Sequence, residues 1–117
     1  MKIAAIVTLL KKEMDLSQEM WRKKQVQTDG SLIVDVRTFN EYKMGHIENS
    51  QLLDIQEPLS FIDQLKTFDK SNTYFLYCRS GARSAQACQI FKQHGISNCF
   101  NLLGGILDWQ GELKMII

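Results

Sequence analysis

Cys78 lies among residues that can activate a thiol. It belongs to the run from Tyr77 to Ser84, which holds several small residues and two arginines. A thiol becomes a good nucleophile once it ionises, and its pKa falls next to cationic side chains or at the N-terminus of a helix. Arg79 and Arg83 provide the cations, and a helix over residues 84–91 would meet the second condition. The run therefore predicts a reactive thiolate.

Three small residues between the two arginines give this loop a second property. Ser80, Gly81 and Ala82 allow a turn to curl until its backbone N–H groups converge on one point. Converging N–H groups bind an anion, above all where a helix begins. We expect the loop to activate a sulfur nucleophile and to hold a negatively charged group directly above it.

The flanking segments predict a strand before the loop and a helix after it. Residues 73–77 form a short aromatic and β-branched run, and the turn-like segment 69–72 precedes them. After the loop, Ala87, Ile90 and Phe91 follow one helical face. Open α/β sheets place their ligands outside the carboxyl ends of the strands, which is the position that this order gives the loop.

The composition limits the classes of function. A chain of 117 residues suits one domain with a single core. Its formal net charge is +1 and it has no long run of Lys or Arg, so we expect no nucleic-acid partner. The three cysteines leave at least one thiol free, which favours a reducing compartment, and none has zinc-site spacing. We therefore expect neither a metal nor a cofactor.

The first ten residues resemble the start of a signal peptide. Their apolar run is short, Lys11 and Lys12 follow it, and no small-x-small cleavage motif is present. The run is also too short to span a bilayer. We expect residues 1–14 to form an N-terminal element whose structure the sequence leaves open, and residues 15–117 to form the main domain. We expect a cytoplasmic protein, monomeric or weakly dimeric, with no membrane partner.

Residues 15–26 predict the first helix of the main domain. Asp15 or Ser17 can serve as its N-cap. Its apolar face would hold Leu16, Met20 and Trp21.

Strand-like and helix-like segments then alternate. Residues 32–36 are an almost continuous β-branched run, which predicts a strand buried on both sides. Thr38 and Glu41 match a capping box, and Gly45 can end the short helix that follows. Residues 51–55 predict a further strand.

The last elements complete the pattern. Pro58 fits the first position of another helix, whose apolar face would hold Phe61, Ile62 and Leu65. Residues 98–103 predict a strand and residues 106–109 a last short helix. This alternation predicts an α/β fold with one central, mainly parallel sheet, helices on both faces and right-handed crossovers.

Three segments resemble the signatures of the rhodanese domain. The stretch from Asp35 to Ile47 has an aspartate-x-arginine strand end followed by Glu-Tyr and by Gly-His-Ile, similar to the first signature of that family. The loop from Cys78 to Ser84 resembles the active-site loop of the family. Leu103-Gly104-Gly105 followed by Trp109 resembles its C-terminal signature. The three segments stand in the family's order and span about residues 17–112.

The resemblance implies a single-domain sulfurtransferase of the thiosulfate sulfurtransferase type. In that family the loop cysteine takes a sulfane sulfur from a donor such as thiosulfate, becomes a persulfide, and passes the sulfur to an acceptor such as cyanide or a thiol. Cys78 would be that cysteine, and the donor and acceptor would be small molecules or other proteins. The rest of the loop would bind the donor: Arg79, Ser80, Gly81, Ala82, Arg83 and Ser84.

Two alternative functions stay open. A persulfide carrier or partner-docking module would keep the loop but show little turnover of small molecules. A cysteine-based phosphatase or arsenate reductase separates its Cys and Arg by five residues, whereas only four lie between Cys78 and Arg83. The shorter loop suits one sulfur atom better than a phosphoryl group, and no residue stands out as the acid that a phosphatase needs.

The charged residues near the loop have individual expectations. Arg83 at the start of a helix is unfavourable for the helix dipole, which indicates a role with an anion. Arg79 is expected to point outward and to select the donor or partner. Asp35 and Arg37 are expected to support the loop, Asp35 by binding backbone groups and Arg37 by pairing with Glu41 or a nearby carboxylate.

The other cysteines and the histidines predict structural roles. Cys88 falls on a helix and Cys99 in a strand, so we interpret both as core residues, and a role in resolving an oxidised nucleophile stays open. His46 falls in a turn and His94 at a helix end, and neither is expected to be catalytic.

Overall fold

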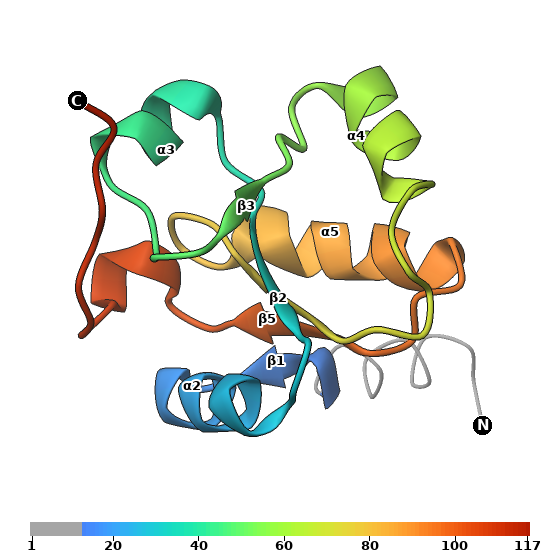
Figure 1. Cartoon of the computed structure of the whole chain (residues 1–117), viewed down its shortest axis with the longest axis horizontal. Helices are drawn as coiled ribbons and strands as arrows, with labels where there is room; N and C mark the ends of the chain where they lie inside the picture. Colours follow the sequence, from blue (N-terminus) through green and yellow to red (C-terminus); the bar gives the residue numbers. More distant parts are fainter. Residues whose placement is uncertain (1–12) are drawn as a thin grey trace.

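The computed structural model describes residues 13–117, which form one sheet covered by helices (Figure 1). The strands are β1 (Asp15–Leu16), β2 (Leu32–Asp35), β3 (Gln51–Leu52), β4 (Tyr74–Tyr77) and β5 (Cys99–Leu102). Their order in the sheet is β1-β5-β4-β2-β3, and each neighbouring pair is parallel. This confirms the α/β fold with a parallel sheet. Residues 1–12, most of the expected N-terminal element, lie outside the described part.

One helix follows each of the first four strands. The helices are α2 (Gln18–Gln27), α3 (Phe39–Met44), α4 (Pro58–Leu65) and α5 (Ala82–Gln93), and the 3-10 turn η1 (Gly105–Asp108) follows β5. Parallel strands cannot be joined by a tight hairpin, so each connection must cross back over the sheet. Because β2 and β4 are neighbouring parallel strands, their carboxyl ends lie at the same edge of the sheet, and the candidate residues that follow them lie there.

The central strand β4 separates two apolar clusters. Its four residues are all buried, and their side chains alternate between the two faces of the sheet. Tyr74 and Leu76 belong to the cluster under α4 and α5, together with Phe91. Phe75 and Tyr77 belong to the cluster under α2. Helices therefore cover both faces, which anchors the end of β4 from two sides.

The start of the main domain differs from its prediction. Asp15 and Leu16 do not begin a helix but form β1, which pairs with β5. The helix begins after Ser17, whose hydroxyl accepts a hydrogen bond from the N–H of Met20. Trp21 is buried as expected, whereas the Met20 side chain is 51% exposed. Hydrogen bonding to a neighbouring strand, which a local pattern does not reveal, outweighs helical periodicity here.

Several local predictions are confirmed, and two predicted elements differ from the structure in length or type. Thr38 and Glu41 form the capping box, and Pro58 occupies the first turn of α4. The strand predicted at 51–55 keeps the strand conformation only over its first two residues, because the chain turns away before α4. The helix predicted at 106–109 is a single 3-10 turn.

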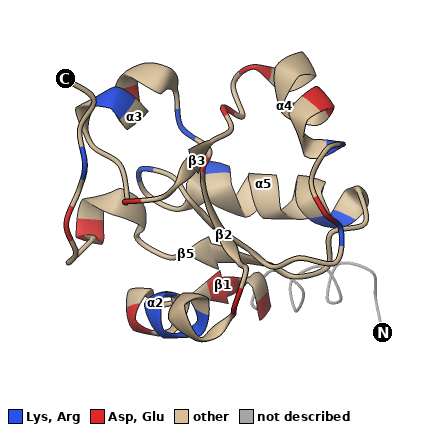
Figure 2. Ribbon diagram, in the orientation of Figure 1, with Lys and Arg blue, Asp and Glu red and all other residues tan. Residues whose placement is uncertain are grey.

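Charged positions are distributed over several elements. Figure 2 shows basic residues on α2, α3, α5 and the connecting loops, with acidic residues among them. Across residues 13–117, no helix combines the length and the apolar character needed to cross a bilayer.

Candidate active site

A four-residue turn connects the carboxyl end of β4 to the N-terminus of α5. Cys78 follows the last residue of the strand, and Ala82 begins the helix. Gly81 precedes the helix with a φ of 105°, a backbone conformation that favours glycine. A Cβ at this position would lie 3.2 Å from the backbone oxygen of Leu102, so the turn is also packed tightly against β5.

The sulfur of Cys78 is buried and accepts hydrogen bonds from its own loop. The residue is 1% exposed. The backbone N–H of Gly81 donates to Sγ at 3.1 Å, and the hydroxyl of Ser84 lies 3.3 Å from Sγ as a donor. Burial alone would raise the pKa of Cys78, but hydrogen bonds from the Ser84 hydroxyl and from backbone N–H groups of the loop outweigh it and lower this pKa. The arrangement stabilises a thiolate.

The C-terminal Gly-Gly motif holds the other side of this turn. The N–H of Ile106 donates to the carbonyl of Cys78 at 2.9 Å, and that of Leu107 donates to the carbonyl of Arg79 at 3.1 Å. Gly105 has a φ of 58°, and a Cβ there would lie only 2.3 Å from the carbonyl oxygen of Arg79. A side chain would therefore displace the loop, which explains why glycine stands at this point.

A buried polar residue that the sequence analysis missed supports the loop from β5. Asn101 is 1% exposed, and its side-chain nitrogen donates to the carbonyl of Gly81 at 3.1 Å and to Oδ1 of Asp15 at 2.9 Å. Its Oδ1 accepts from the hydroxyl of Ser84 at 2.5 Å. In the sequence, a single amide side chain within an otherwise apolar strand segment could have indicated the role of Asn101.

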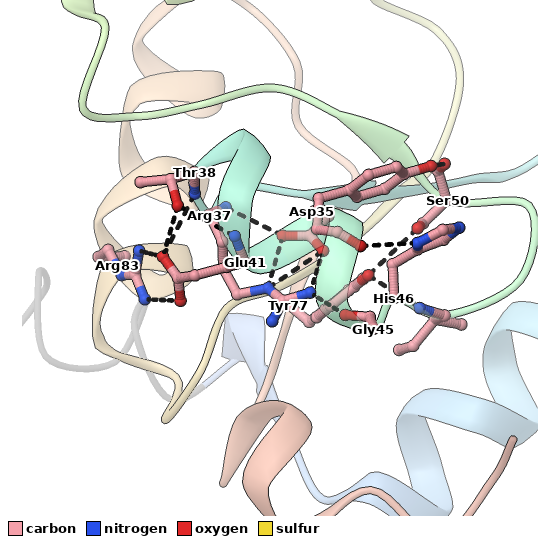
Figure 3. A network of polar contacts seen from close by, with 11 residues as sticks. Asp35, Arg37, Thr38, Glu41, Gly45, His46, Ser50, Tyr77 and Arg83 are labelled. Atoms are coloured by element: carbon pink, nitrogen blue, oxygen red, sulfur yellow. Dashed lines mark hydrogen bonds and ion pairs between the residues drawn. The ribbon is translucent and has the colours of Figure 1, made fainter. Parts of the chain in front are cut away.

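The anion that Arg83 meets in the structure is a protein carboxylate. Its guanidinium donates to the two oxygens of Glu41 at 2.7 and 2.9 Å, and Figure 3 shows the two side chains facing each other. The bond from Arg83, partly opposed by burial, lowers the pKa of Glu41 to about 2. The charge of Arg83 is thus largely neutralised, and the loop nitrogen atoms rather than this arginine contact the sulfur.

Arg79, which is expected to point outward, is exposed and lines a hollow of about 600 Å³. Within residues 13–117, its side chain forms no ion pair. The hollow is also lined by Arg37 and by apolar side chains, among them Met44, Leu107 and Leu113. A cation next to an apolar hollow is therefore presented at the edge of the loop.

Asp35 and Arg37 pair with each other at the end of β2. Nη2 of Arg37 lies 2.7 Å from Oδ2 of Asp35 and also donates to the carbonyl of Gly45 at 2.6 Å (Figure 3). The expected carboxylate partner of Arg37 is thus Asp35, not Glu41. Asp35 binds a backbone group as expected, but this is the N–H of Arg37, at 2.9 Å, and not one in the loop. The pair fixes the strand end behind the loop.

The other cysteines and the histidines lie away from this turn. The sulfur atoms of Cys88 and Cys99 are 3.2 Å apart, both thiols are buried, and burial raises the pKa of Cys99. Each histidine has its Nδ1 at 2.9 Å from a carbonyl oxygen four residues earlier, His46 from Tyr42 and His94 from Ile90. The described residues contain no cluster of three His, Cys, Asp or Glu side chains that could hold a metal ion.

Comparisons with known proteins find relatives of this chain. A sulfurtransferase of Allochromatium vinosum is 34% identical over 96 residues, which cover 81% of this chain and 86% of that protein. YrkF of Bacillus subtilis, named as a sulfur carrier protein, is 31% identical over 101 residues, 86% of this chain and 52% of YrkF. The crystal structure of a rhodanese-like domain protein from Staphylococcus aureus has a TM-score of 0.73 and 30% identity, covering 86% of this chain and 96% of that one.

The family model described as the rhodanese-like domain matches residues 15–112. This range includes the Cys78 loop and the two segments beside it, the end of β2 and the Gly-Gly motif. The chain therefore belongs to the rhodanese-like domain family.

Proposed function

We propose that the chain is a sulfurtransferase that carries the transferred sulfur as a persulfide on Cys78. The observation that carries this proposal is the set of donors at Sγ, the N–H of Gly81 and the hydroxyl of Ser84, at 3.1 and 3.3 Å. Donors at the start of a helix lie close enough to Sγ to stabilise negative charge on it without any movement of the backbone. A sulfurtransferase among the relatives supports the same function.

The reaction would use thiosulfate, or a persulfide of the same reactivity, as the donor. The thiolate of Cys78 attacks the outer sulfur of thiosulfate, a new S–S bond forms, and the old S–S bond breaks with its electron pair leaving on sulfite. The resulting persulfide then gives its outer sulfur to cyanide or to an acceptor thiolate, and the Cys78 thiolate returns. Neither step requires a proton transfer once the cysteine is ionised, so no histidine is needed.

The exposed charge of Arg79 would attract an anionic donor to the edge of the loop. Its guanidinium has no carboxylate partner within residues 13–117, unlike that of Arg83. The loop N–H of Gly81 already lies within hydrogen-bond distance of Sγ, which favours one sulfur atom over a bulkier phosphoryl group. Phosphatase or arsenate reductase chemistry is therefore less well supported than sulfur transfer.

A persulfide carrier is the second candidate. Cys78 is only 1% exposed, and the hollow beside the loop is bounded by Met44, Leu107 and Leu113, which are 70%, 58% and 45% exposed. Exposed apolar side chains around a hollow suit a protein surface better than a small anion. The relative named as a sulfur carrier supports this alternative.

Incubation with thiosulfate followed by intact-mass measurement tests the proposal. We expect the protein to gain one sulfur atom, the Cys78→Ser variant to gain none, and a Cys88→Ala control to gain as much as the unmodified chain. A gain only from a persulfide-loaded cysteine desulfurase, and not from thiosulfate, would favour the carrier. No gain from either donor would refute both forms of sulfur transfer, and hydrolysis of an aryl phosphate would then point to a phosphatase.

A further inference from the structure

The hydroxyl of Ser84 faces two acceptors but has one hydrogen to donate. Its Oγ lies 3.3 Å from Sγ of Cys78 and 2.5 Å from Oδ1 of Asn101. Ser84 is 0% exposed, so no solvent molecule can take the place of either partner at its surface. At any moment the hydrogen points to the sulfur or to the amide oxygen, because a hydroxyl is a single donor.

The amide of Asn101 cannot turn over to relieve this competition. Its nitrogen donates to the carbonyl of Gly81 and to Oδ1 of Asp15, at 3.1 and 2.9 Å. A flipped amide would replace these two hydrogen bonds by oxygen–oxygen contacts, at a cost of about 1 kcal/mol or more for each lost bond, although the N–H of Ala85 would still donate to the Gly81 carbonyl. The network therefore assigns the oxygen to the side of Ser84.

We propose that Asn101 is a positioning residue for the Cys78 sulfur, which acts by competing with that sulfur for the single hydroxyl hydrogen of Ser84. While the sulfur is a neutral thiol, the hydrogen of Ser84 belongs to Asn101. When the thiolate forms, its charge draws this hydrogen, and the hydroxyl turns toward Sγ. Asn101 thus limits how strongly Ser84 stabilises the thiolate.

This competition has a chemical use that rests on the proposed sulfur transfer. A thiolate that is held too strongly by donors has a low pKa and is a weaker nucleophile. Once the outer sulfur is bound, the negative charge lies mainly on that atom, and Sγ needs the hydroxyl less. The hydrogen can then return to Asn101, so the same donor serves Sγ in the free thiolate and Oδ1 of Asn101 in the loaded cysteine.

Charged groups on the surrounding elements also act on Cys78. Arg83 is the charged neighbour that interacts with it electrostatically, and Glu41 neutralises Arg83 in turn. The other charged groups on the elements packed around the loop are Asp15 on β1, Asp35 and Arg37 at the end of β2, Arg79 in the loop and Asp108 on η1. Substituting Asn101 also removes its hydrogen bond to Asp15, but this loss is the same with and without the Ser84 hydroxyl, so the double-variant cycle isolates the hydroxyl.

A double-variant cycle tests the proposal in the full chain. The pKa of Cys78 is read from the pH dependence of its alkylation by iodoacetamide, with the modified residue identified by mass spectrometry, in the unmodified chain, Ser84→Ala, Asn101→Leu and the double variant. We expect Asn101→Leu to shift the pKa of Cys78 downward when Ser84 is present, relative to the shift that the same substitution causes in the Ser84→Ala background. The difference between the two shifts should be at least half a unit, or about threefold in the amount of thiolate at low pH. Equal effects in the two backgrounds would overturn the proposal, since a merely structural role of Asn101 does not depend on Ser84.

A measurement on the unmodified side chain of Asn101 keeps the test decisive if the Leu variant does not fold. The side-chain amide resonances of Asn101 should shift with the same midpoint as the ionisation of Cys78, and this shift should vanish in Ser84→Ala. Side-chain amide resonances of Asn101 that do not shift when Cys78 ionises would refute the competition. Neither readout uses a sulfur donor, so a failure of the proposed sulfur transfer would be recognised separately, by the absence of a persulfide.

Discussion

Glu41→Gln would remove the charge that neutralises Arg83 while keeping the helix cap. The carboxylate of Glu41 accepts two hydrogen bonds from Arg83 and also the N–H of Thr38, in the capping box of α3. Glutamine has the same length and can occupy this position of a capping box. The substitution therefore separates the ion pair, which joins α3 to the start of α5, from the local end of the helix.

The magnitude follows from the lowered pKa of Glu41. A shift from 4.5 to about 2 corresponds to about 3 kcal/mol of stabilisation of the folded state by the ionised form. The two side chains are 24% and 28% exposed, so solvent screens part of this energy, and exposed pairs usually contribute less than about 1 kcal/mol. We expect Glu41→Gln to lower the free energy of unfolding by about 1–2 kcal/mol at neutral pH.

The effect should depend on pH in one direction. Because the pKa of Glu41 is lower in the folded chain, its stabilisation is present above about pH 4.5 and disappears as the pH falls toward 2. Urea unfolding followed by the fluorescence of the buried Trp21 measures this at several pH values. A matched control is Glu48→Gln, which removes an exposed carboxylate 3.9 Å from Lys114 and should change the stability by less than about 0.5 kcal/mol.

An equal stability of Glu41→Gln and the unmodified chain at neutral pH would refute this reasoning. So would a difference that does not shrink between about pH 4.5 and pH 2, since the carboxyl group of the folded chain becomes protonated as the pH falls toward its pKa of about 2.

Three further substitutions test the loop and the core. Gly105→Ala should lower the free energy of unfolding by more than about 2 kcal/mol and reduce persulfide formation, because the new Cβ meets backbone oxygens of the loop. The control Gly30→Ala, at a φ of 75° with open space around it, should lower the free energy of unfolding by about 1 kcal/mol. Thermal unfolding measures the stability of both variants, and intact mass measures persulfide formation. Arg79→Ala should raise KM for thiosulfate about threefold to tenfold with little change in kcat, measured by thiocyanate formation. Phe91→Ala should lower the free energy of unfolding by about 3–5 kcal/mol in urea, and Phe39→Ala, at an exposed position, by far less.

The sequence was most informative where local chemistry decides the structure. The capping box of Thr38 and Glu41 and the position of Pro58 depend on neighbours within one helical turn, and both are confirmed. The buried run before Cys78 likewise predicted β4 to within one residue. These features could be predicted because their partners are close in the chain.

The errors arose where the partner is distant in the chain. Asp15 and Leu16 form a strand because β5 lies beside them, 86 residues further along the chain. Glu41 reaches Arg83 across 42 residues, so a sequence pattern could suggest an anion for this arginine but not which one. Asn101 escaped notice for the same reason, since its three partners come together only in the folded sheet.

These distant contacts also change the physical explanation of the thiolate. The sequence placed two arginines beside Cys78 and assigned the lowered pKa to their charge as well as to the helix. In the structure, Arg83 forms an ion pair with Glu41 and Arg79 is exposed, and it is uncharged donors, chiefly from Ser84 and Gly81, that lower the pKa of Cys78. Such donors act at contact and are not screened by salt, whereas the attraction of a distant anion by Arg79 is screened. We therefore propose that the loop separates two tasks: uncharged donors at contact hold the sulfur, and one exposed charge, that of Arg79, attracts the sulfur donor.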